Sequence, residues 1–340
     1  MKKIYAALFV LLILIGLAKA MKIFGSSTNF GESKKHLYIH TGKASKEAVM
    51  STINDSAFIK NIKTFEFLAG KLKVWQRLRP GRYEIKKGES LYSLIQKLRT
   101  GEQSPVNLTI TKLRTKKDLA SLIARKFESD SATVISYFNN NDSLKKFGLD
   151  TNTLLTAVLP NTYSLLWNSS PQKILSKLNE QKKKFWNTER IQKAIKLGLT
   201  PEEVQVIASI VEEETIRHDE KPDIAAVYLN RLKKGMNLGA DPTVKFAVGD
   251  FTLKRILFSH INSTASSPYN TYKNAGLPPG PICTASEITI DAVLNARENN
   301  YLFFCAKPNG NGYHAFSVTA QEHYKNARAY QQWLDSMMIK

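Results

Sequence analysis

The sequence predicts a mixed α+β fold that follows an N-terminal apolar helix. Three observations support this prediction: an uninterrupted apolar run close to the N-terminus, short alternating segments between amphipathic helices, and one apolar helix that ends in three consecutive glutamates. Hydrophobic residues make up 43% of the 340 positions, which is enough for a packed core and excludes a disordered chain. The length suggests one larger domain or two modest ones.

The first element is the apolar run from residue 4 to residue 18, which two lysines precede. A membrane-spanning helix needs about 20 residues, and the run reaches this length if the helix continues to Phe24 with Lys19 extended toward the interface. Ala18-Lys19-Ala20 also matches the cleavage pattern of a signal peptide, so the segment is either an uncleaved anchor or a removed leader. We favour an anchor over residues 1–24, with its N-terminus in the cytoplasm and the rest of the chain exported.

A polar stretch rich in Ser and Gly, residues 25–35, is predicted to be a linker. A membrane-proximal region, residues 36–105, follows it. The alternating residues 36–41 predict a strand in this region, and the apolar spacing within residues 45–53 and 57–69 predicts two helices.

Residues 79–105 carry a more specific pattern. Arg79-Pro80-Gly81 predicts a turn before a strand, and Ser90 is placed to cap the helix that follows. The order of strand, Gly88-Glu89-Ser90-Leu91 and helix resembles the LysM module, which binds glycans that contain N-acetylglucosamine. The resemblance implies a LysM-like subdomain within the membrane-proximal region, and it adds glycan binding as an expectation.

The remaining residues, 106–340, are predicted to form a second α+β domain. Rigid loops are expected at 266–272 and 276–280 because proline fixes the backbone there. The other expected elements are a strand at 106–110, helices at 115–127, 131–138 and 171–186, a segment at 190–199 that leads into a helix from Thr200, a helix from His218 to Lys234, a strand at 301–305, a hairpin turn at 309–312, a return strand from His314 and a closing helix at 321–338.

The helix that begins at Thr200 is the feature around which the second domain is predicted to be organised. Thr200 is the expected N-cap, Pro201 stands at the first helical position, and Glu203 completes a capping box. A long aliphatic run follows and ends in the three glutamates. The sequence therefore predicts a buried helix with carboxylates at its C-terminal end.

A helical wheel separates two of these glutamates. At about 100° per residue the aliphatic side chains form one broad arc, and Glu214 falls inside it. Gln205, Ser209 and Glu212 fall on the opposite, polar side. Apolar surroundings raise the pKa of a carboxyl group, so Glu214 is a candidate general acid, whereas Glu212 should stay ionised. Acidic triplets more often form solvated helix faces, so a structural role remains the alternative.

The formal net charge of +20 points to an anionic partner: nucleic acid, phospholipid headgroups or an acidic cell-wall polymer. Many of the lysines are dispersed along helices, as on any solvated face. No recognised nucleic-acid-binding motif accompanies the charge, so we expect no nucleic-acid partner.

The residues that commonly bind metals are sparse. Cys283 and Cys305 are the only cysteines, which excludes a disulfide framework and a cysteine-rich zinc site. They either pair in an oxidising compartment or serve as two small buried residues. His36 and His40 share one face of the predicted strand, but a metal site needs a third ligand. His314 is either catalytic or structural. We expect neither a metal nor a cofactor.

Six segments in the right order carry a resemblance that covers most of the chain after the anchor. With them, the chain resembles the YceG-like family of endolytic murein transglycosylases, and the anchor and LysM-like piece agree with the layout of that family. The segments are Ile207-Ala-Ser-Ile-Val-Glu-Glu-Glu-Thr215, Tyr228-Leu-Asn-Arg-Leu232, Asp241-Pro-Thr-Val244, Tyr269-Asn-Thr-Tyr272, Gly276-Leu-Pro-Pro-Gly280 and His314-Ala-Phe316.

The resemblance assigns roles within the glutamate helix. The family pattern has two glutamate positions, of which the second is catalytic and matches Glu214, while the first matches Glu212 as a supporting residue. Glu213 stands where relatives often have lysine, and we expect its charge to raise the pKa of Glu214 further. Asn161 stands where an aspartate is common, which puts any charge-dependent role there in doubt.

The resemblance also implies an activity. The chain is expected to be a lyase that cuts peptidoglycan glycan strands between N-acetylmuramic acid and N-acetylglucosamine without water, leaves 1,6-anhydro ends and so ends strand elongation. Residues 106–340 would be the catalytic domain, anchored in the inner membrane beside a cell-wall synthase complex. The candidates to shape the cleft are Asn230, Arg231, Asp241, Thr243, Tyr269, Asn270, Tyr272 and His314.

Two alternatives stay open at this point. One is a hydrolase of the same bond, in which a second carboxylate such as Asp241 activates water. The other is a non-catalytic scaffold that binds peptidoglycan in the envelope, since a fold does not fix a function.

Overall fold

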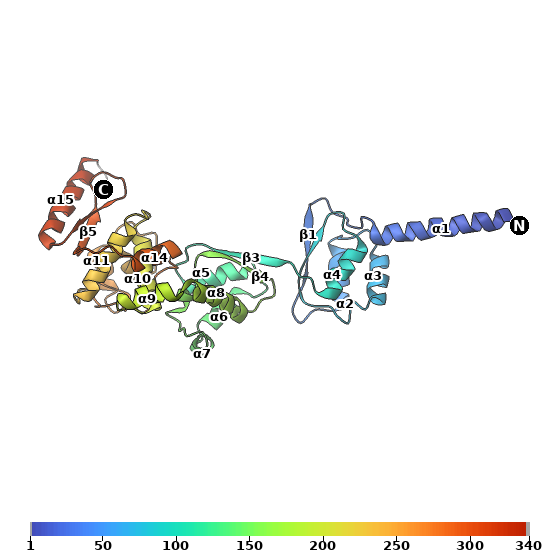
Figure 1. Ribbon diagram of the computed structural model, residues 1–340, viewed down its shortest axis with the longest axis horizontal. Coiled ribbons are helices and arrows are strands. Elements are labelled where there is room, and N and C mark those ends of the chain that lie inside the picture. Colours follow the sequence, from blue (N-terminus) through green and yellow to red (C-terminus); the bar gives the residue numbers. More distant parts are fainter. Residues whose placement is uncertain (1, 338–340) are drawn as a thin grey trace. The chain divides into compact units, whose positions relative to one another are not determined.

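The computed structural model describes residues 2–337, and it has the mixed helix and strand content of the predicted α+β class (Figure 1). The chain divides into two compact units. The N-terminal unit holds the residues up to Leu108 together with 124–130 and 164–170. The C-terminal unit holds 109–123, 131–163 and the residues from Pro171 onward.

The N-terminal helix α1 (Lys2–Phe24) has a mean hydropathy of 2.4 over its most apolar 18 residues, and its side chains from Lys3 to Lys22 are exposed. It ends at the predicted Phe24, whose ring contacts Tyr92 with 5.3 Å between centroids. Its length and composition suit a membrane-spanning helix, although a signal sequence shares both properties.

The rest of the N-terminal unit packs three helices on a two-stranded sheet. The antiparallel strands β1 (Lys34–Ile39) and β2 (Gly81–Lys86) pair from Lys34↔Lys86 to Ile39↔Gly81. Alternate residues such as Leu37 and Tyr83 point into the core because the side-chain period of a strand is two. The helices are α2 (Lys46–Asp55), α3 (Ile62–Lys71) and α4 (Leu91–Thr100).

Both segments that the sequence set apart belong to this unit. In the predicted linker, Ser27 and Thr28 are buried, and the Gly88 amide donates a hydrogen bond to Thr28 Oγ1 at 2.8 Å. In the LysM-like stretch, the Ser93 amide donates to Ser90 Oγ at 3.2 Å, so Ser90 caps α4 as predicted. Because β2 pairs with β1, this stretch shares one sheet with residues well before it; its glycan binding stays a prediction.

The C-terminal unit is mostly helical. Two strands contain a unit boundary, β3 (Pro105–Ile110) and β4 (Asn161–Leu166), and they pair with each other, as β5 does with β6. The other elements after β3 are α5 (Lys116–Ala124), whose last residue belongs to the N-terminal unit, α6 (Ser131–Phe138), α7 (Asn141–Lys145), the 3₁₀-helix η1 (Leu154–Ala157), α8 (Pro171–Phe185), α9 (Thr188–Lys196), α10 (Pro201–Glu214), α11 (Lys221–Lys233), α12 (Asp241–Val248), α13 (Phe258–Ser263), α14 (Glu287–Leu294), β5 (Phe303–Ala306), β6 (His314–Ser317) and α15 (Ala320–Ser336).

Helix α10 lies in the core of this unit, against α9, α11, α12 and α14. The predicted polar side was wrong for two residues, because Gln205 and Ser209 are buried. Gln205 Nε2 donates to the carbonyl of Thr156 at 2.9 Å, and Ser209 Oγ accepts from the Ile282 amide at 3.0 Å. These hydrogen bonds offset the cost of burying the polar groups, so α10 is enclosed on every side from Val204 to Val211.

The predicted hairpin near the C-terminus is confirmed. Strands β5 and β6 pair antiparallel from Phe303↔Ser317 to Ala306↔His314, and α15 packs on both (Figure 1). Thr319 caps α15 through a capping box with Glu322. The described part of this helix ends at Ser336, and the predicted end at residue 338 lies outside the described residues.

Candidate active site

Glu214 is the last residue of α10, where the helix leaves the core. The predicted capping box fixes the other end of the helix: the Glu203 amide donates to Thr200 Oγ1 at 3.2 Å, and Glu203 Oε2 accepts from the Thr200 amide at 2.7 Å. Glu214 keeps part of its surface exposed and lines a cavity of about 700 Å³. The other lining residues are Tyr228, Arg231, Met236, Asn237, Leu238, Gly239, Asp241, Tyr272, Phe303, Phe304, His323 and Tyr324.

Tyr228 is the direct partner of Glu214. It lies on α11 with its ring buried, and its hydroxyl donates a hydrogen bond to Glu214 Oε1 at 2.5 Å. Burial and the neighbouring carboxylate hold the pKa of Tyr228 well above its usual range, so the hydroxyl stays a donor. The bond fixes one carboxyl oxygen and leaves Oε2 of Glu214 for other partners.

The surroundings raise the pKa of Glu214 to about 7. Burial is the largest cause, and the negative charge of Asp241 acts in the same direction. The hydrogen bond from Tyr228 and the positive charges of Lys245 and Arg231 lower the pKa but do not offset the burial. Near neutral pH this carboxyl group therefore exists in both protonation states, as a general acid and base requires.

Glu212 lies two residues before Glu214, on another side of α10 and in a different environment. Its Oε2 accepts hydrogen bonds from Lys221 Nζ at 3.0 Å and from Ser286 Oγ at 2.9 Å, and it also accepts from the Thr289 hydroxyl. Burial alone would raise the pKa of Glu212, but the bonds from Thr289 and Lys221 and the lysine charge more than offset it, so the pKa is lowered. Glu212 is ionised as predicted, but it is held in an ion pair and not on a wet helix face.

Glu213 does not act on Glu214 in the expected way. It forms ion pairs with Arg114 at 3.0 Å and Lys112 at 3.1 Å. Burial raises its pKa, and these two cations lower it by more. The carboxylate that raises the pKa of Glu214 is Asp241, so the expectation for Glu213 was wrong.

Three of the predicted cleft residues line the cavity with Glu214. Arg231 is braced by the backbone, since its Nε donates to the Leu302 carbonyl and its Nη1 to the Leu238 carbonyl, both at 2.6 Å. Asp241 begins α12, and Tyr272 donates its hydroxyl to Asp241 Oδ1 at 2.6 Å. Arg231, Asp241 and Tyr272 thus form a polar rim next to Glu214.

Gly239 is needed where this rim turns. Its φ of +56° is in the left-handed region that favours glycine. An added Cβ would lie 3.2 Å from Arg231 Nη1 and 3.7 Å from the Tyr272 ring. A larger residue here would strain the backbone and press against the Arg231 guanidinium, while it would only touch the Tyr272 ring.

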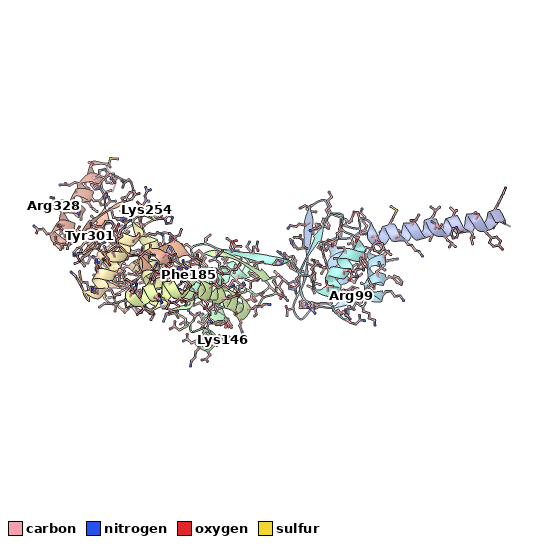
Figure 2. The ribbon with its side chains drawn as sticks, in the orientation of Figure 1. Arg99, Lys146, Phe185, Lys254, Tyr301 and Arg328 are labelled. Atoms are coloured by element: carbon pink, nitrogen blue, oxygen red, sulfur yellow. The ribbon has the colours of Figure 1, made fainter. Side chains whose placement is uncertain are left out.

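The other predicted cleft residues do not line this cavity. Asn230 Nδ2 donates to the carbonyls of Asn299 and Tyr301, both at 3.0 Å, and so ties α11 to the chain before β5 (Tyr301 is labelled in Figure 2). The His314 amide and Nδ1 bond to the two carboxylate oxygens of Glu220 at 2.8 and 3.0 Å. Both contacts are typical of residues that hold neighbouring elements in place.

Thr243, Tyr269 and Asn270 also support the loops around the cavity. The Thr243 hydroxyl is buried and bonds to Thr271 Oγ1 at 2.8 Å. Asn270 is buried, and its Oδ1 accepts from the Tyr272 amide at 3.0 Å, which positions a rim residue. Tyr269 packs its ring against Phe246 at 4.6 Å and lines a separate cavity.

The sequence reasoning missed the partner of Glu214 and one wall of the cavity. Tyr228 is an apolar position of the helix predicted from His218 to Lys234 and the first residue of one of the six segments, but neither observation marks it as a partner of Glu214. The wall consists of Phe303 and Phe304 of β5 and His323 and Tyr324 of α15. Phe303 and His323 stack at 5.3 Å. Aromatic residues in the hairpin and the closing helix were a signal, since aromatic rings are common in ligand pockets.

The residues that commonly bind metals lie apart from one another in the described part of the chain. Among residues 2–337, no group of three or more His, Cys, Asp or Glu side chains is arranged to hold a metal ion. Cys283 and Cys305 are free, and the Cys283 thiol donates to the Ser209 carbonyl at 3.3 Å.

A carboxyl group with a pKa of about 7, held by a tyrosine in a cavity with one aromatic wall, is the arrangement expected of an acid–base enzyme. The comparisons with known proteins are more specific. The model of the YceG-like family matches residues 37–329, so the chain belongs to this family.

Named relatives agree with this assignment. The chain is 31% identical over 303 residues to the endolytic murein transglycosylase of Bacillus subtilis (strain 168). The match covers 84% of this chain and 82% of that protein. It is 27% identical to the protein of the same name from Streptococcus pneumoniae (strain D39), but spans only 55% of its length. A crystal structure of a protein described as YceG-like from Listeria monocytogenes is 25% identical, with a TM-score of 0.57 over 87% of this chain and 99% of that one.

Proposed function

We propose that this chain is an endolytic murein transglycosylase, a lyase that cuts glycan strands of peptidoglycan between N-acetylmuramic acid and N-acetylglucosamine. The observation that carries the proposal is the raised pKa of Glu214, about 7, inside the cavity of a YceG-like chain. The name shared by the relatives from Bacillus and Streptococcus supports the reaction class.

Glu214 performs both proton transfers of the proposed reaction. The protonated carboxyl group donates its proton to the glycosidic oxygen as the bond to C1 of the muramic acid breaks. The resulting carboxylate then takes the proton of the C6 hydroxyl on the same sugar, and the C6 oxygen bonds to C1. The products are a free hydroxyl on the leaving strand and a 1,6-anhydro end, water is not consumed, and Glu214 is protonated again.

One carboxyl group is sufficient for this reaction because the nucleophile belongs to the substrate. A hydrolase would need a second carboxylate to activate water. Asp241 lines the same cavity and is the residue that favours this second candidate function. Its bond from Tyr272 gives it a different assignment in the transglycosylase, in which it forms part of the polar rim and raises the pKa of Glu214.

The other residues of the cavity hold the carboxyl group and the sugars. Tyr228 orients Glu214, and the ion pair of Glu212 with Lys221 fixes the end of α10. Arg231, Asp241 and Tyr272 offer polar contacts to sugar hydroxyls, and the rings of Phe303 and Tyr324 offer apolar faces to the sugar rings.

The proposed location is based on α1. In the proposal, α1 is an uncleaved single-pass anchor in the cytoplasmic membrane, and both compact units lie on its outer side. The apolar composition and exposure of α1 support this topology. A membrane-held enzyme can act on glycan strands as cell-wall synthases release them, so the proposal includes a synthase complex as partner and the ending of strand elongation as role.

The test is mass spectrometry of fragments that the full-length chain in detergent releases from purified peptidoglycan. Wild-type protein should give 1,6-anhydro ends, and Glu214→Gln should lower their rate of formation by about a thousandfold because the general acid and base is lost. Glu213→Gln is the matched control, since its side chain pairs with Lys112 and Arg114, and it should retain activity.

The mass of the released ends separates the candidates. Reducing ends, heavier by one water, would identify a hydrolase and direct attention to Asp241. Equal release by wild type and Glu214→Gln would contradict the role of Glu214.

A further inference from the structure

Helix α3 of the N-terminal unit has an unusual outer face. Its inner face buries Phe65 and Ala69 in the core of the unit. Lys63, Phe67 and Lys71 are exposed and share the opposite face, since residues four apart lie above one another on a helix. Phe67 is 63% exposed, between two lysines.

Neighbouring residues extend this face. Trp75 and Lys46 line a shallow hollow of about 480 Å³ together with Lys63, Phe67 and Lys71. Lys71 Nζ lies 5.8 Å from the centre of the Phe67 ring, and Lys46 pairs with Glu66 at 2.7 Å. We name Lys63, Phe67, Lys71 and Trp75 the α3 face. It combines two aromatic rings with an excess of positive charge.

The α3 face lies on the same side of the unit as the helix proposed to cross the membrane. Figure 1 shows α3 on the side from which α1 leaves. The Lys60 amide, just before α3, donates to the carbonyl of Ser27, just after α1, at 2.8 Å. Phe24 at the end of α1 packs on Tyr92 of α4, and α4 in turn packs against α3. The end of α1 and the start of α3 are therefore held together.

We propose that the α3 face docks on the membrane surface and binds the phosphate groups of anionic phospholipids. Lys63 and Lys71 contact the phosphates, and Phe67 and Trp75 lie among the headgroups. A single exposed Phe is ordinary on any protein. Here it stands between lysines beside a Trp, which is the composition of protein surfaces that lie in a membrane interface. The proposal rests on the anchoring of α1 included in the proposed function.

Docking of this kind depends on charge and salt. Each Lys or Arg close to an anionic bilayer changes the docking equilibrium by about fivefold. Replacing both Lys63 and Lys71 by Gln should therefore lower the docked fraction relative to the undocked one by about thirtyfold. Salt at about 0.5 M should have a similar effect because it shortens the range of the attraction.

The experiment is hydrogen–deuterium exchange of the full-length chain in lipid nanodiscs, read at the amides of residues 62–75. One set of discs contains zwitterionic phosphatidylcholine, and the other contains an equal mixture with anionic phosphatidylglycerol. Exchange should be slower in the anionic discs. Lys63→Gln/Lys71→Gln should abolish the difference, and Phe67→Ser, a change at an exposed site, should reduce it.

The matched control is Lys43→Gln/Lys126→Gln. It removes the same charge from exposed sites of the same unit, and Lys43 follows the end of β1 that is opposite to its junction with α1. This control should keep the wild-type difference. Equal exchange of the wild-type chain in both kinds of disc would overturn the proposal, and so would an equal loss in the control, because the effect would then be one of total charge.

Failure of the anchor can be told apart from failure of the α3 face. If the chain does not remain with the discs, the anchoring by α1 is wrong, and the same exchange is measured with anionic vesicles added to the released chain. Slower exchange at residues 62–75 on these vesicles would support the α3 face, and unchanged exchange would overturn it.

Discussion

Glu212 and Glu214 are two residues apart on α10, yet their surroundings move their pKa values in opposite directions. Burial acts on both carboxyl groups as the largest single cause. Glu212 has a lysine and two hydroxyls as partners, and its pKa is lowered. Glu214 has one neutral hydroxyl, and its pKa is raised to about 7. The carboxyl group of Glu214 is the more deeply buried of the two and has no cation as a hydrogen-bond partner, and both differences favour its neutral form.

The difference assigns one carboxylate to structure and the other to chemistry. Lys221 is almost fully buried, with its side chain 2% exposed, and its charge is balanced by Glu212. This ion pair joins α10 to α11, and Thr289 extends the network to α14. The fixed end of the helix then presents Glu214 to the cavity without a cation that would hold it permanently ionised.

Removal of Lys221, the cation that pairs with Glu212, should have the largest effect. Lys221→Met leaves Glu212 without its cation, and we expect the free energy of unfolding of the C-terminal unit to fall by about 3–5 kcal/mol. Urea unfolding measures the change. Adding Glu212→Gln should restore part of the loss, because no unpaired charge then remains.

Lys182→Met is the control for this prediction. Lys182 is also buried, but its partner Glu202 is 39% exposed and can return to water. The free energy of unfolding should therefore fall by less in Lys182→Met than in Lys221→Met. An equal fall in the free energy of unfolding for the two lysine variants would contradict the prediction that the Glu212–Lys221 pair contributes more to stability than the Glu202–Lys182 pair.

The contributions of the two glutamates to stability should change with pH in opposite directions. The folded pKa of Glu214 is raised from 4.5 to about 7, so wild-type stability relative to Glu214→Gln should fall as the pH rises from about 4.5 to 7. The folded pKa of Glu212 is lowered from 4.5, so the advantage over Glu212→Gln should be complete above that pH and lost below it. Urea titrations between about pH 3 and 8 measure both; parallel curves would contradict the assignment.

Tyr228→Phe tests how the one hydrogen-bond partner described for Glu214 affects its pKa. Its hydroxyl lowers the pKa of Glu214, so its removal should raise that pKa and move the alkaline limb of the activity profile to higher pH. The rate at the optimum should fall on the order of tenfold because the carboxyl group is less well oriented. Rates of anhydro-product formation across pH measure both effects.

Tyr163→Phe is the matched control for Tyr228→Phe. It removes another buried hydroxyl, which bonds to the Leu159 carbonyl at 2.7 Å and does not line the cavity. Its activity profile should keep the wild-type shape, even if stability falls. An unchanged profile for Tyr228→Phe as well would show that the tyrosine only fills space.

The local features of the site were predictable from the sequence. The capping box at Thr200, the place of Glu214 at the end of α10 and the hairpin before α15 depend on neighbouring residues, so their signals lie in short stretches. Helix α14 was missed although its signal was local: Ser286 caps it by accepting from the Thr289 amide.

The features that depend on packing were not predictable in this way. The wheel placed Gln205 and Ser209 toward water because their partners, the carbonyl of Thr156 and the amide of Ile282, lie far away in the sequence. The pattern of α11 marked Tyr228 as buried, but the contact of its hydroxyl with Glu214 depends on how α10 and α11 cross.

The aromatic wall is the part of the cavity that is synthesised last. Glu214 leaves the ribosome well before β5 and α15, which supply Phe303, Phe304, His323 and Tyr324. Until these elements fold onto the helices, the cavity beside Glu214 is incomplete. We therefore expect a chain that ends before β5 to present Glu214 on its helix but to lack the surface that would hold a sugar.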